Sequence, residues 1–258
     1  MMKNLTFIIP VHEYVKEYIE KAIDSVSIFT ESRVAIIGPT NVLEELKDKS
    51  SDVLTKLTDV DFIVNDTTET GFCEQVNKAA MSCTTEYFSI LEFDDVITPT
   101  WVKNVKEYTE SKKDVSVFLP ILEIVNSENT DIVSLGNEIA WSTAFVDDLG
   151  YLDMEAINAY YDFQICGGVF KTEDFISIGG LKQSLKIASV FEMLMRYLQN
   201  SKKVFVIPKI GCIHTYGRNG SYMVTSKDEI TQEEGEWLIN TAKQEIFFKE
   251  DRNKKFNE

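Results

Sequence analysis

The sequence is poor in positive charge. Its 258 residues include 26 lysines and arginines against 42 aspartates and glutamates, which gives a formal net charge of −16. This sign is wrong for a protein that binds nucleic acid or an anionic membrane over a broad surface. A ligand that is itself an anion would need something other than the overall field to attract it.

Cysteines and long apolar runs are also few. The four cysteines form no CxxC pair, so their pattern indicates neither a zinc knuckle nor a disulfide scaffold and favours reduced, mostly buried thiols. No run approaches the roughly 20 apolar residues of a membrane-spanning helix, and the run from Leu5 to Pro10 is too short for a signal peptide. The sequence therefore predicts a cytoplasmic protein.

Apolar residues, by contrast, make up 44% of the chain, which is enough for a packed core. In the first half, short apolar runs alternate with amphipathic stretches, the pattern of a largely parallel α/β sheet. Asn41 is suited to cap the helix that follows the second strand. We expect strands at 7–9, 34–37, 62–64 and 87–91 and helices at 13–26 and 70–83.

The second half is less regular. The turn at 126–129 between two apolar runs predicts a hairpin of strands 115–124 and 132–135. We also expect a helix at 188–200, a strand at 204–208 and a terminal helix at 231–249 capped by Thr231, while 145–163 has no clear period. The simplest organisation is one domain over 1–230, followed by a C-terminal helix and tail over 231–258.

An acidic cluster, Glu92-Phe93-Asp94-Asp95, stands at the end of the predicted strand 87–91. Ligands of parallel sheets gather outside the carboxyl ends of the strands. Carboxylates at such a point can hold Mg²⁺ or Mn²⁺ while leaving positions for substrate phosphate. The alternative is a solvated acidic turn before a helix that begins near Thr100.

In this context the chain resembles the GT-A glycosyltransferases of family 2. Four features carry the resemblance, in the order that the family shows: the Pro-x-Tyr-like turn Pro10-Val11-His12, the helix Gly71–Ala80 with Asn77, the metal motif Leu91–Asp95, and the two Gly-Gly segments at 167–168 and 179–180. They span roughly residues 5–222. The resemblance implies a GT-A fold, with a Rossmann-like, mostly parallel central sheet flanked by helices.

The resemblance also implies roles for individual residues. Asp94, Asp95 and His214 would hold Mn²⁺ or Mg²⁺, with His214 in a Gly-rich loop after the strand 204–208. Glu192 would be the catalytic base, because it is the only acid where the family places one. The nucleotide sugar would contact Pro10, His12, Asp66, Asn77, Glu92, Asp94 and Arg218, and the guanidinium of Arg218 suits the diphosphate.

Several of these residues have alternative interpretations. Glu192 could instead form an i,i+4 ion pair with Arg196, Asp66 could be a turn or helix-cap residue, and His12 could cap the first helix. The chain also departs from the family pattern at two places. The first acid of the metal motif is Glu92, where the family has an aspartate, and the second strand ends without the acidic residue that faces the nucleobase in the family.

Aromatic residues offer candidate stacking platforms for a sugar, although aromatics more often belong to the core. The candidates are Trp101, Trp141, Tyr160 and Tyr161, and Trp141 is the one we select.

The sequence thus predicts a metal-dependent glycosyltransferase that moves a sugar, with inversion, from a nucleotide-diphosphosugar such as a UDP-sugar to a hydroxyl of a glycan, protein or lipid-linked acceptor. Because the site and the diphosphate are both anionic, a bridging cation is needed, and we expect strict metal dependence. One alternative is a catalytically reduced GT-A domain that acts as a binding or structural module. A nucleotidyltransferase is disfavoured, because no Gly-rich phosphate loop follows the first strand.

Overall fold

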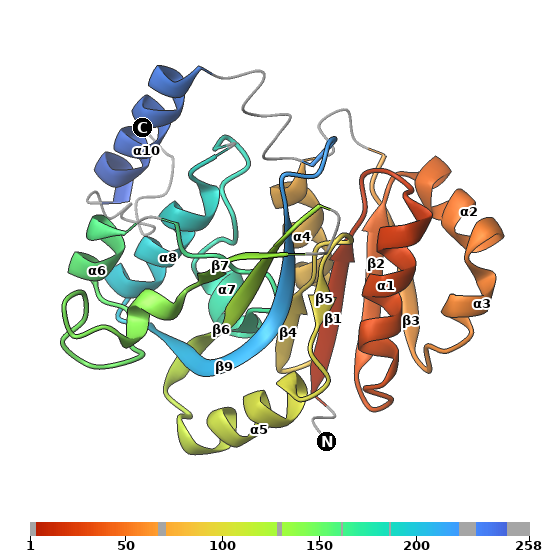
Figure 1. Cartoon of the computed structure of the whole chain (residues 1–258), viewed down its shortest axis with the longest axis horizontal. Coiled ribbons are helices and arrows are strands. Elements are labelled where there is room, and N and C mark those ends of the chain that lie inside the picture. The colour runs from red at the N-terminus through yellow and green to blue at the C-terminus, as the bar shows by residue number, and fades with distance from the viewer. Residues whose placement is uncertain are drawn as a thin grey trace, which may run out of the picture.

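The computed structural model describes residues 4–66, 71–127, 131–160, 162–185, 187–221 and 231–246. Within them the strands form one nine-stranded sheet in the order β3-β2-β1-β4-β8-β6-β9-β5, with β7 paired to β6 (Figure 1). Helices cover both faces of this curled sheet.

The first half of the chain builds the parallel part of the sheet. Central β1 pairs in parallel with β2 and β4, and β2 pairs in parallel with β3. Parallel pairing brings the carboxyl ends of these strands to one edge of the sheet, as the alternating pattern predicts. The elements are β1 (Leu5–Pro10), α1 (Lys16–Ser27), β2 (Arg33–Gly38), α2 (Thr40–Lys49), α3 (Ser51–Leu54), β3 (Val60–Val64), α4 (Phe72–Ser82) and β4 (Tyr87–Ile90).

The second half extends the sheet with strands of both directions. Strand β6 runs parallel to β9 and antiparallel to β7 and β8, and β8 joins β4 in the antiparallel sense. The predicted hairpin is therefore confirmed as β6–β7. The elements are β5 (Val96–Ile97), α5 (Trp101–Ser111), β6 (Val115–Asn126), β7 (Ile132–Gly136), η1 (Glu138–Trp141), α6 (Met154–Ala159), β8 (Val169–Lys171), α7 (Thr172–Ser177), α8 (Ser189–Gln199), β9 (Lys203–Tyr216) and α10 (Gln232–Ile246).

Two apolar cores lie on the two faces of the sheet. Alternate residues of β1 divide between them: Phe7 and Ile9 pack with α1, α2 and α5, whereas Ile8 packs with α4, α7 and α8. All of β1 is buried, because helices cover it on both sides. The first strand is consequently a rigid element, and its end is a well-defined point from which to build a site.

Strand β9 corrects one expectation. The sequence predicts a strand that stops at Pro208 and a loop that carries His214, but β9 continues to Tyr216 and pairs His214 with Ile124. The ladder to β6 shifts register between Leu119 and Ile121, opposite this proline. A proline is tolerated at such an irregularity, because no regular ladder hydrogen bond is lost there.

Asn41 is a second correction, because it does not cap α2. The helix begins at Thr40, with Pro39 at the N-cap position, so Asn41 lies inside it. The side chain of Asp66 accepts hydrogen bonds from Thr40 N at 2.6 Å and Thr40 Oγ1 at 2.5 Å. A carboxylate from the segment after β3 thus satisfies the free amide at the helix start.

The terminal helix α10 begins as expected. Thr231 Oγ1 accepts from Glu234 N at 3.3 Å while Glu234 Oε2 accepts from Thr231 N at 3.1 Å, which is a capping box. The helix packs against α8 (Figure 1).

The domain boundary at 230 stays a prediction, and residues 247–258 lie outside the described part. None of the described helices is long and apolar enough to cross a bilayer.

Trp101 provides a test of this packing. It is fully buried, and its Nε1 donates to Gly167 O at 2.8 Å. Trp101→Phe leaves a cavity and an unpaired carbonyl, so the free energy of unfolding should fall by about 2–4 kcal/mol. Urea unfolding followed by circular dichroism measures it. Trp237→Phe, at a residue 65% exposed, is the matched control and should change stability by less than about 0.5 kcal/mol. Equal effects in the two variants would contradict the assignment.

Candidate active site

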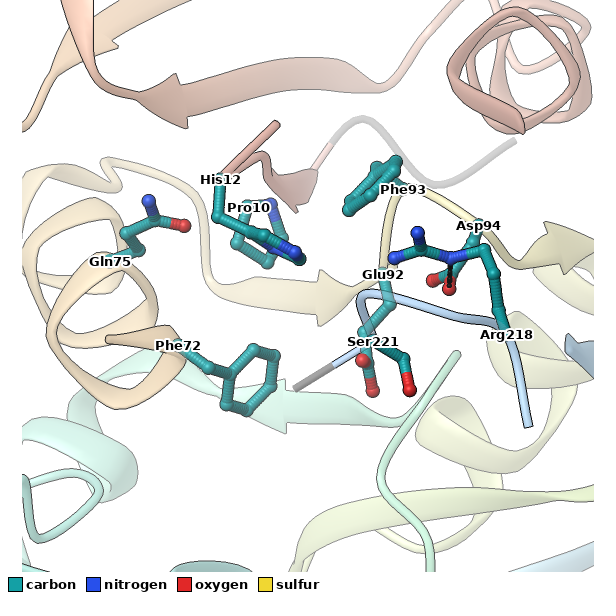
Figure 2. Close-up of a pocket in the computed structure, with 9 residues that line it drawn as sticks. All are labelled: Pro10, His12, Phe72, Gln75, Glu92, Phe93, Asp94, Arg218 and Ser221. Carbon is teal, nitrogen blue, oxygen red and sulfur yellow. Dashed lines mark hydrogen bonds and ion pairs between the residues drawn. The ribbon is translucent and has the colours of Figure 1, made fainter. Parts of the chain in front are cut away.

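A cleft lies at the edge of the sheet where β1 and β4 end. Residues from the segment after β1, the start of α4, the segment after β4 and the segment after β9 meet there. Figure 2 shows the lining residues, which are Pro10, His12, Phe72, Gln75, Glu92, Phe93, Asp94, Arg218 and Ser221. Of the residues predicted to contact a nucleotide sugar, the cleft collects Pro10, His12, Glu92, Asp94 and Arg218.

A tight turn after β4 points the acidic side chains of the cluster in different directions. Leu91 N still donates to Ile8 O, and the chain then turns so that Asp95 N donates to Glu92 O at 3.0 Å. Glu92 and Asp94 line the cleft, while Asp95 is fully buried and does not line it. The acidic cluster is therefore split between two environments.

Asp95 is bound by His214 and by the backbone of Thr215. Its Oδ2 lies 2.9 Å from His214 Nδ1, and its Oδ1 accepts from Thr215 N at 2.8 Å. Burial by itself would lower the pKa of His214, but the charge and hydrogen bond of Asp95, together with the charges of Glu92 and Asp94, raise it to about 10. The structure thus brings two predicted metal ligands together as an ion pair, and their role as metal ligands stays a prediction.

Asp94 is bound by Arg218. The guanidinium Nε donates to Asp94 Oδ2 at 2.7 Å and Nη1 donates to Glu13 Oε1 at 2.7 Å. Its central carbon lies 4.9 Å from the centroid of the Phe93 ring, in a cation–π contact. Burial and the charge of Asp95 raise the pKa of Asp94, and Arg218 opposes that rise. Glu13 is a member of this network that the sequence did not single out.

Glu92 is the other acid of the cluster that lines the cleft. Burial raises its pKa to about 8, with further contributions from the charges of Asp95 and Asp94 that His214 and Arg218 oppose. Glu92 and Asp94 offer hard oxygen donors in one cleft, and Asp94 is already paired there with Arg218. Such donors fit a divalent cation such as Mg²⁺ or Mn²⁺.

The other end of the cleft is formed by His12, Phe72 and Gln75. His12 packs its ring edge against Phe93 at 5.0 Å between centroids, and His12 Nε2 lies 3.4 Å from Gly220 O. Gln75 Nε2 donates to Val11 O at 3.3 Å. The sequence analysis missed Phe72 and Gln75, although their place directly after Gly71, in the helix that carries the family resemblance, was the available signal.

Asp66 and Asn77 lie outside this cleft. Asp66 caps α2, which is the geometry of its alternative interpretation. Asn77 Nδ2 donates to Leu181 O at 2.7 Å and its Oδ1 accepts from Leu181 N at 2.8 Å. A Cβ on Gly180 would lie 2.3 Å from Asn77 Oδ1, so the glycine permits this close approach. In this structure both residues hold backbone segments, and their contact with a nucleotide stays a prediction.

Glu192 is fully buried in α8 and does not line the cleft. Its Oε1 and Oε2 accept from Arg196 at 2.6 Å each, and Lys182 Nζ lies 3.3 Å from Oε1. Arg196 in turn donates to the carbonyls of Ile178 and Gly180. The i,i+4 ion pair with Arg196 is thus present, and a role for Glu192 as base would require it to leave these partners.

The candidate stacking residues pack within the protein. Trp101 is core, Trp141 Nε1 donates to Val206 O at 3.1 Å, and the ring of Tyr160 packs against Phe163 at 5.3 Å. None of the three lines the described cleft. Tyr161 lies outside the described residues.

The cysteines are free thiols, as expected. Three are buried, and Cys83 is partly exposed. Burial raises the pKa of Cys83 to about 11 and that of Cys166 well above its usual value, so both are protonated at neutral pH.

The fold and the site define a GT-A protein, and sequence comparison identifies its family. The family model for glycosyl transferase family 2 matches residues 6–145, more than half of the chain. The chain belongs to glycosyltransferase family 2. No curated protein matches its sequence.

Solved structures share the fold at low sequence identity. Staphylococcus aureus TarS 1–349 in complex with UDP-GlcNAc superposes with a TM-score of 0.72 at 17% identity, over 94% of this chain and 66% of that one. A second crystal structure of TarS 1–349 gives 0.65 at 16% identity, over 82% of this chain and 60% of that one. The mannosyltransferase PcManGT from Pyrobaculum calidifontis, in complex with GDP-Man and Mn²⁺, gives 0.62 at 13% identity, over 93% and 73%. The chain spans less than two thirds of the length of these TarS structures.

The ion pair of Glu192 leads to a stability prediction. Glu192→Gln removes the counter-ion of two cations from a buried position, so the free energy of unfolding should fall by about 3–5 kcal/mol. Glu173→Gln breaks the exposed pair with Lys171 and should cost at most about 1 kcal/mol. Chemical denaturation of both variants checks this. A loss in Glu192→Gln no larger than in the control would mean that the buried pair does not hold α8 in place.

Proposed function

We propose that this protein is a metal-dependent glycosyltransferase that transfers a sugar from a nucleoside-diphosphate sugar, a UDP-sugar, to an acceptor hydroxyl with inversion. The observation that carries the proposal is the meeting of Glu92 and Asp94 with Arg218 in one cleft, at the carboxyl ends of β1 and β4, in a chain of glycosyltransferase family 2. The donors UDP-GlcNAc and GDP-Man in the TarS and PcManGT structures support the choice of donor class.

The two ends of the cleft suit different parts of the proposed donor. His12 and Phe72 offer rings against which a nucleobase or ribose can pack. At the opposite end, Arg218 offers a guanidinium to the diphosphate, while Glu92 and Asp94 offer oxygen ligands to a divalent cation. When bound, such a cation neutralises charge on the leaving nucleoside diphosphate.

The transfer itself requires a proton acceptor. The acceptor oxygen attacks the anomeric carbon, the bond from that carbon to the diphosphate oxygen breaks, and the hydroxyl proton passes to a base. Glu192 remains the predicted base. That role requires Glu192 to exchange its ion pairs with Arg196 and Lys182 for the acceptor hydroxyl.

The buried state of Glu192 also favours a second candidate function. Glu92 and Asp94 are the only carboxylates among the described residues that line the cleft, and both face the proposed cation and diphosphate. A GT-A domain that binds a nucleotide sugar without transferring it fits this arrangement.

Ligand binding tests the donor assignment. A thermal-shift panel of UDP, GDP, UDP-sugars and GDP-sugars, with and without Mn²⁺, should give a metal-dependent rise of about 5–10 °C at a hundredfold excess over Kd. Asp94→Asn, which removes one cation ligand, should lose the metal-dependent part of the shift. No shift with any nucleotide, or full transfer activity in excess chelator, would count against the proposed function.

Turnover of Glu192→Gln separates the two candidates. If Glu192 is the base, the variant abolishes transfer and retains the nucleotide-dependent thermal shift, since the charge on the carboxylate is lost while the cleft is unchanged. The rate is measured per folded molecule, at a temperature where the variant is native. Unchanged turnover would assign Glu192 to the ion pair alone, and no turnover in the wild-type protein despite donor binding would favour the binding module.

A further inference from the structure

The guanidinium of Arg218 already binds Asp94, one of the two proposed cation ligands in the cleft. It bridges Asp94 and Glu13 at 2.7 Å each, its side chain is only 6% exposed, and the rings of Phe93 and Tyr18 flank it at 4.9 and 5.5 Å. The carboxylate of Asp94 thus already has a buried positive partner. A divalent cation that approached the same carboxylate would meet the repulsion of this guanidinium at close range.

Within the described part of the chain, one nitrogen of Arg218 has no hydrogen-bond partner. Arg218 Nη2 is buried and has no hydrogen-bond acceptor among the described residues. A buried donor without an acceptor is unfavourable, so an anionic oxygen entering the cleft would be stabilised there. Phosphate oxygens suit a guanidinium, because it can donate two parallel N–H bonds to them.

The turn that carries Arg218 lies against the side chain of Glu13. Gly217 and Gly220 have φ values of +73° and +84°, in the region that favours glycine, and Ser221 N donates to Arg218 O at 3.1 Å. A Cβ on Gly220 would lie 3.1 Å from Glu13 Oε1. The backbone of this turn therefore packs directly against the Glu13 carboxylate, which gives Arg218 a partner independent of Asp94.

We propose that Arg218 and a divalent cation compete for Asp94, and that Glu13 is the positioning residue that keeps Arg218 in the cleft when it leaves Asp94. A nucleoside diphosphate supplies the guanidinium with a new anionic partner, so Asp94 becomes available to the metal. Metal and nucleotide then bind cooperatively: Mn²⁺ binds weakly to the free protein and more tightly beside the nucleotide. This inference rests on the proposed function, because it concerns the same cleft.

Calorimetric titration of Mn²⁺ into the full chain tests the competition. Arg218→Met should bind Mn²⁺ alone about tenfold more tightly than the wild type, because the competing charge is gone. Arg33→Met is the matched control: Arg33 also bridges two carboxylates, Asp59 at 3.0 Å and Asp61 at 2.8 Å, but it lies at the start of β2, away from the cleft. Wild-type Mn²⁺ affinity in Arg218→Met would overturn the competition.

The same titrations with saturating UDP or GDP test the cooperativity and the role of Glu13. The nucleotide should tighten Mn²⁺ binding about tenfold in the wild type and in Arg33→Met, and not in Arg218→Met. Glu13→Gln should lose most of this enhancement, and Glu13→Asp should regain part of it, which a merely structural role would not produce. An unchanged enhancement in Glu13→Gln would overturn its positioning role.

The competition, the cooperativity and the proposed function can each fail separately in these titrations. The wild-type protein with and without nucleotide tests the cooperativity even if Arg218→Met does not fold, and equal Mn²⁺ affinities in the two conditions would overturn it. If neither UDP nor GDP binds to any form of the protein, the proposed function fails, while the titration of Mn²⁺ alone still decides whether Arg218 excludes the metal.

Discussion

Crowding of negative charge at the end of β4 is the constraint on which the site depends. Three carboxylates stand within four residues, and they are partly or fully removed from water, where like charges repel strongly. The repulsion is relieved differently at each carboxylate. Asp95 is paired with His214, Asp94 is paired with Arg218, and burial raises the pKa of Glu92 to about 8, which favours its neutral form. The two cations come from β9 and the turn after it, so this repulsion links the second half of the chain to the strand ends of the first.

The net charge of −16 makes the local charges of the cleft decisive for the binding of an anion. The overall field repels an anionic donor, so attraction has to come from groups inside the cleft. Arg218 provides positive charge in the cleft, and His214 provides it beside Asp95, which does not line the cleft, but each is already bound to a carboxylate. The cleft is consequently close to electrostatic balance in the free protein, and a diphosphate enters with least cost when a further cation enters with it.

The parts of the fold that the sequence predicts are those with a strong local pattern. Strands β1 and β4 are short apolar runs buried on both faces, and α1, α4 and α8 carry apolar residues at helical spacing. Strands β5 and β8 have two and three residues and exist only through pairing with distant partners, so no period reveals them. The extension of β9 past Pro208 has the same cause, because the irregular ladder with β6 accommodates the proline.

For the site, the sequence by itself determined the kinds of group available and their attachment: an acidic cluster at the end of a buried strand, a histidine and an arginine late in the chain, and the order of motifs that places the protein in its family. Only the tertiary structure decided which acid faces the cleft, because the turn after β4 directs Asp94 to one side and Asp95 to the other. It also decided their partners, since His214 and Arg218 lie 119 and 124 residues beyond the acids they bind. The same holds for Glu13, Asp66 and Asn77, whose partners Arg218, Thr40 and Leu181 lie 205, 26 and 104 residues away and leave no periodic trace in the sequence. The pair of Glu192 with Arg196 is the contrast, because its i,i+4 spacing is visible in the sequence.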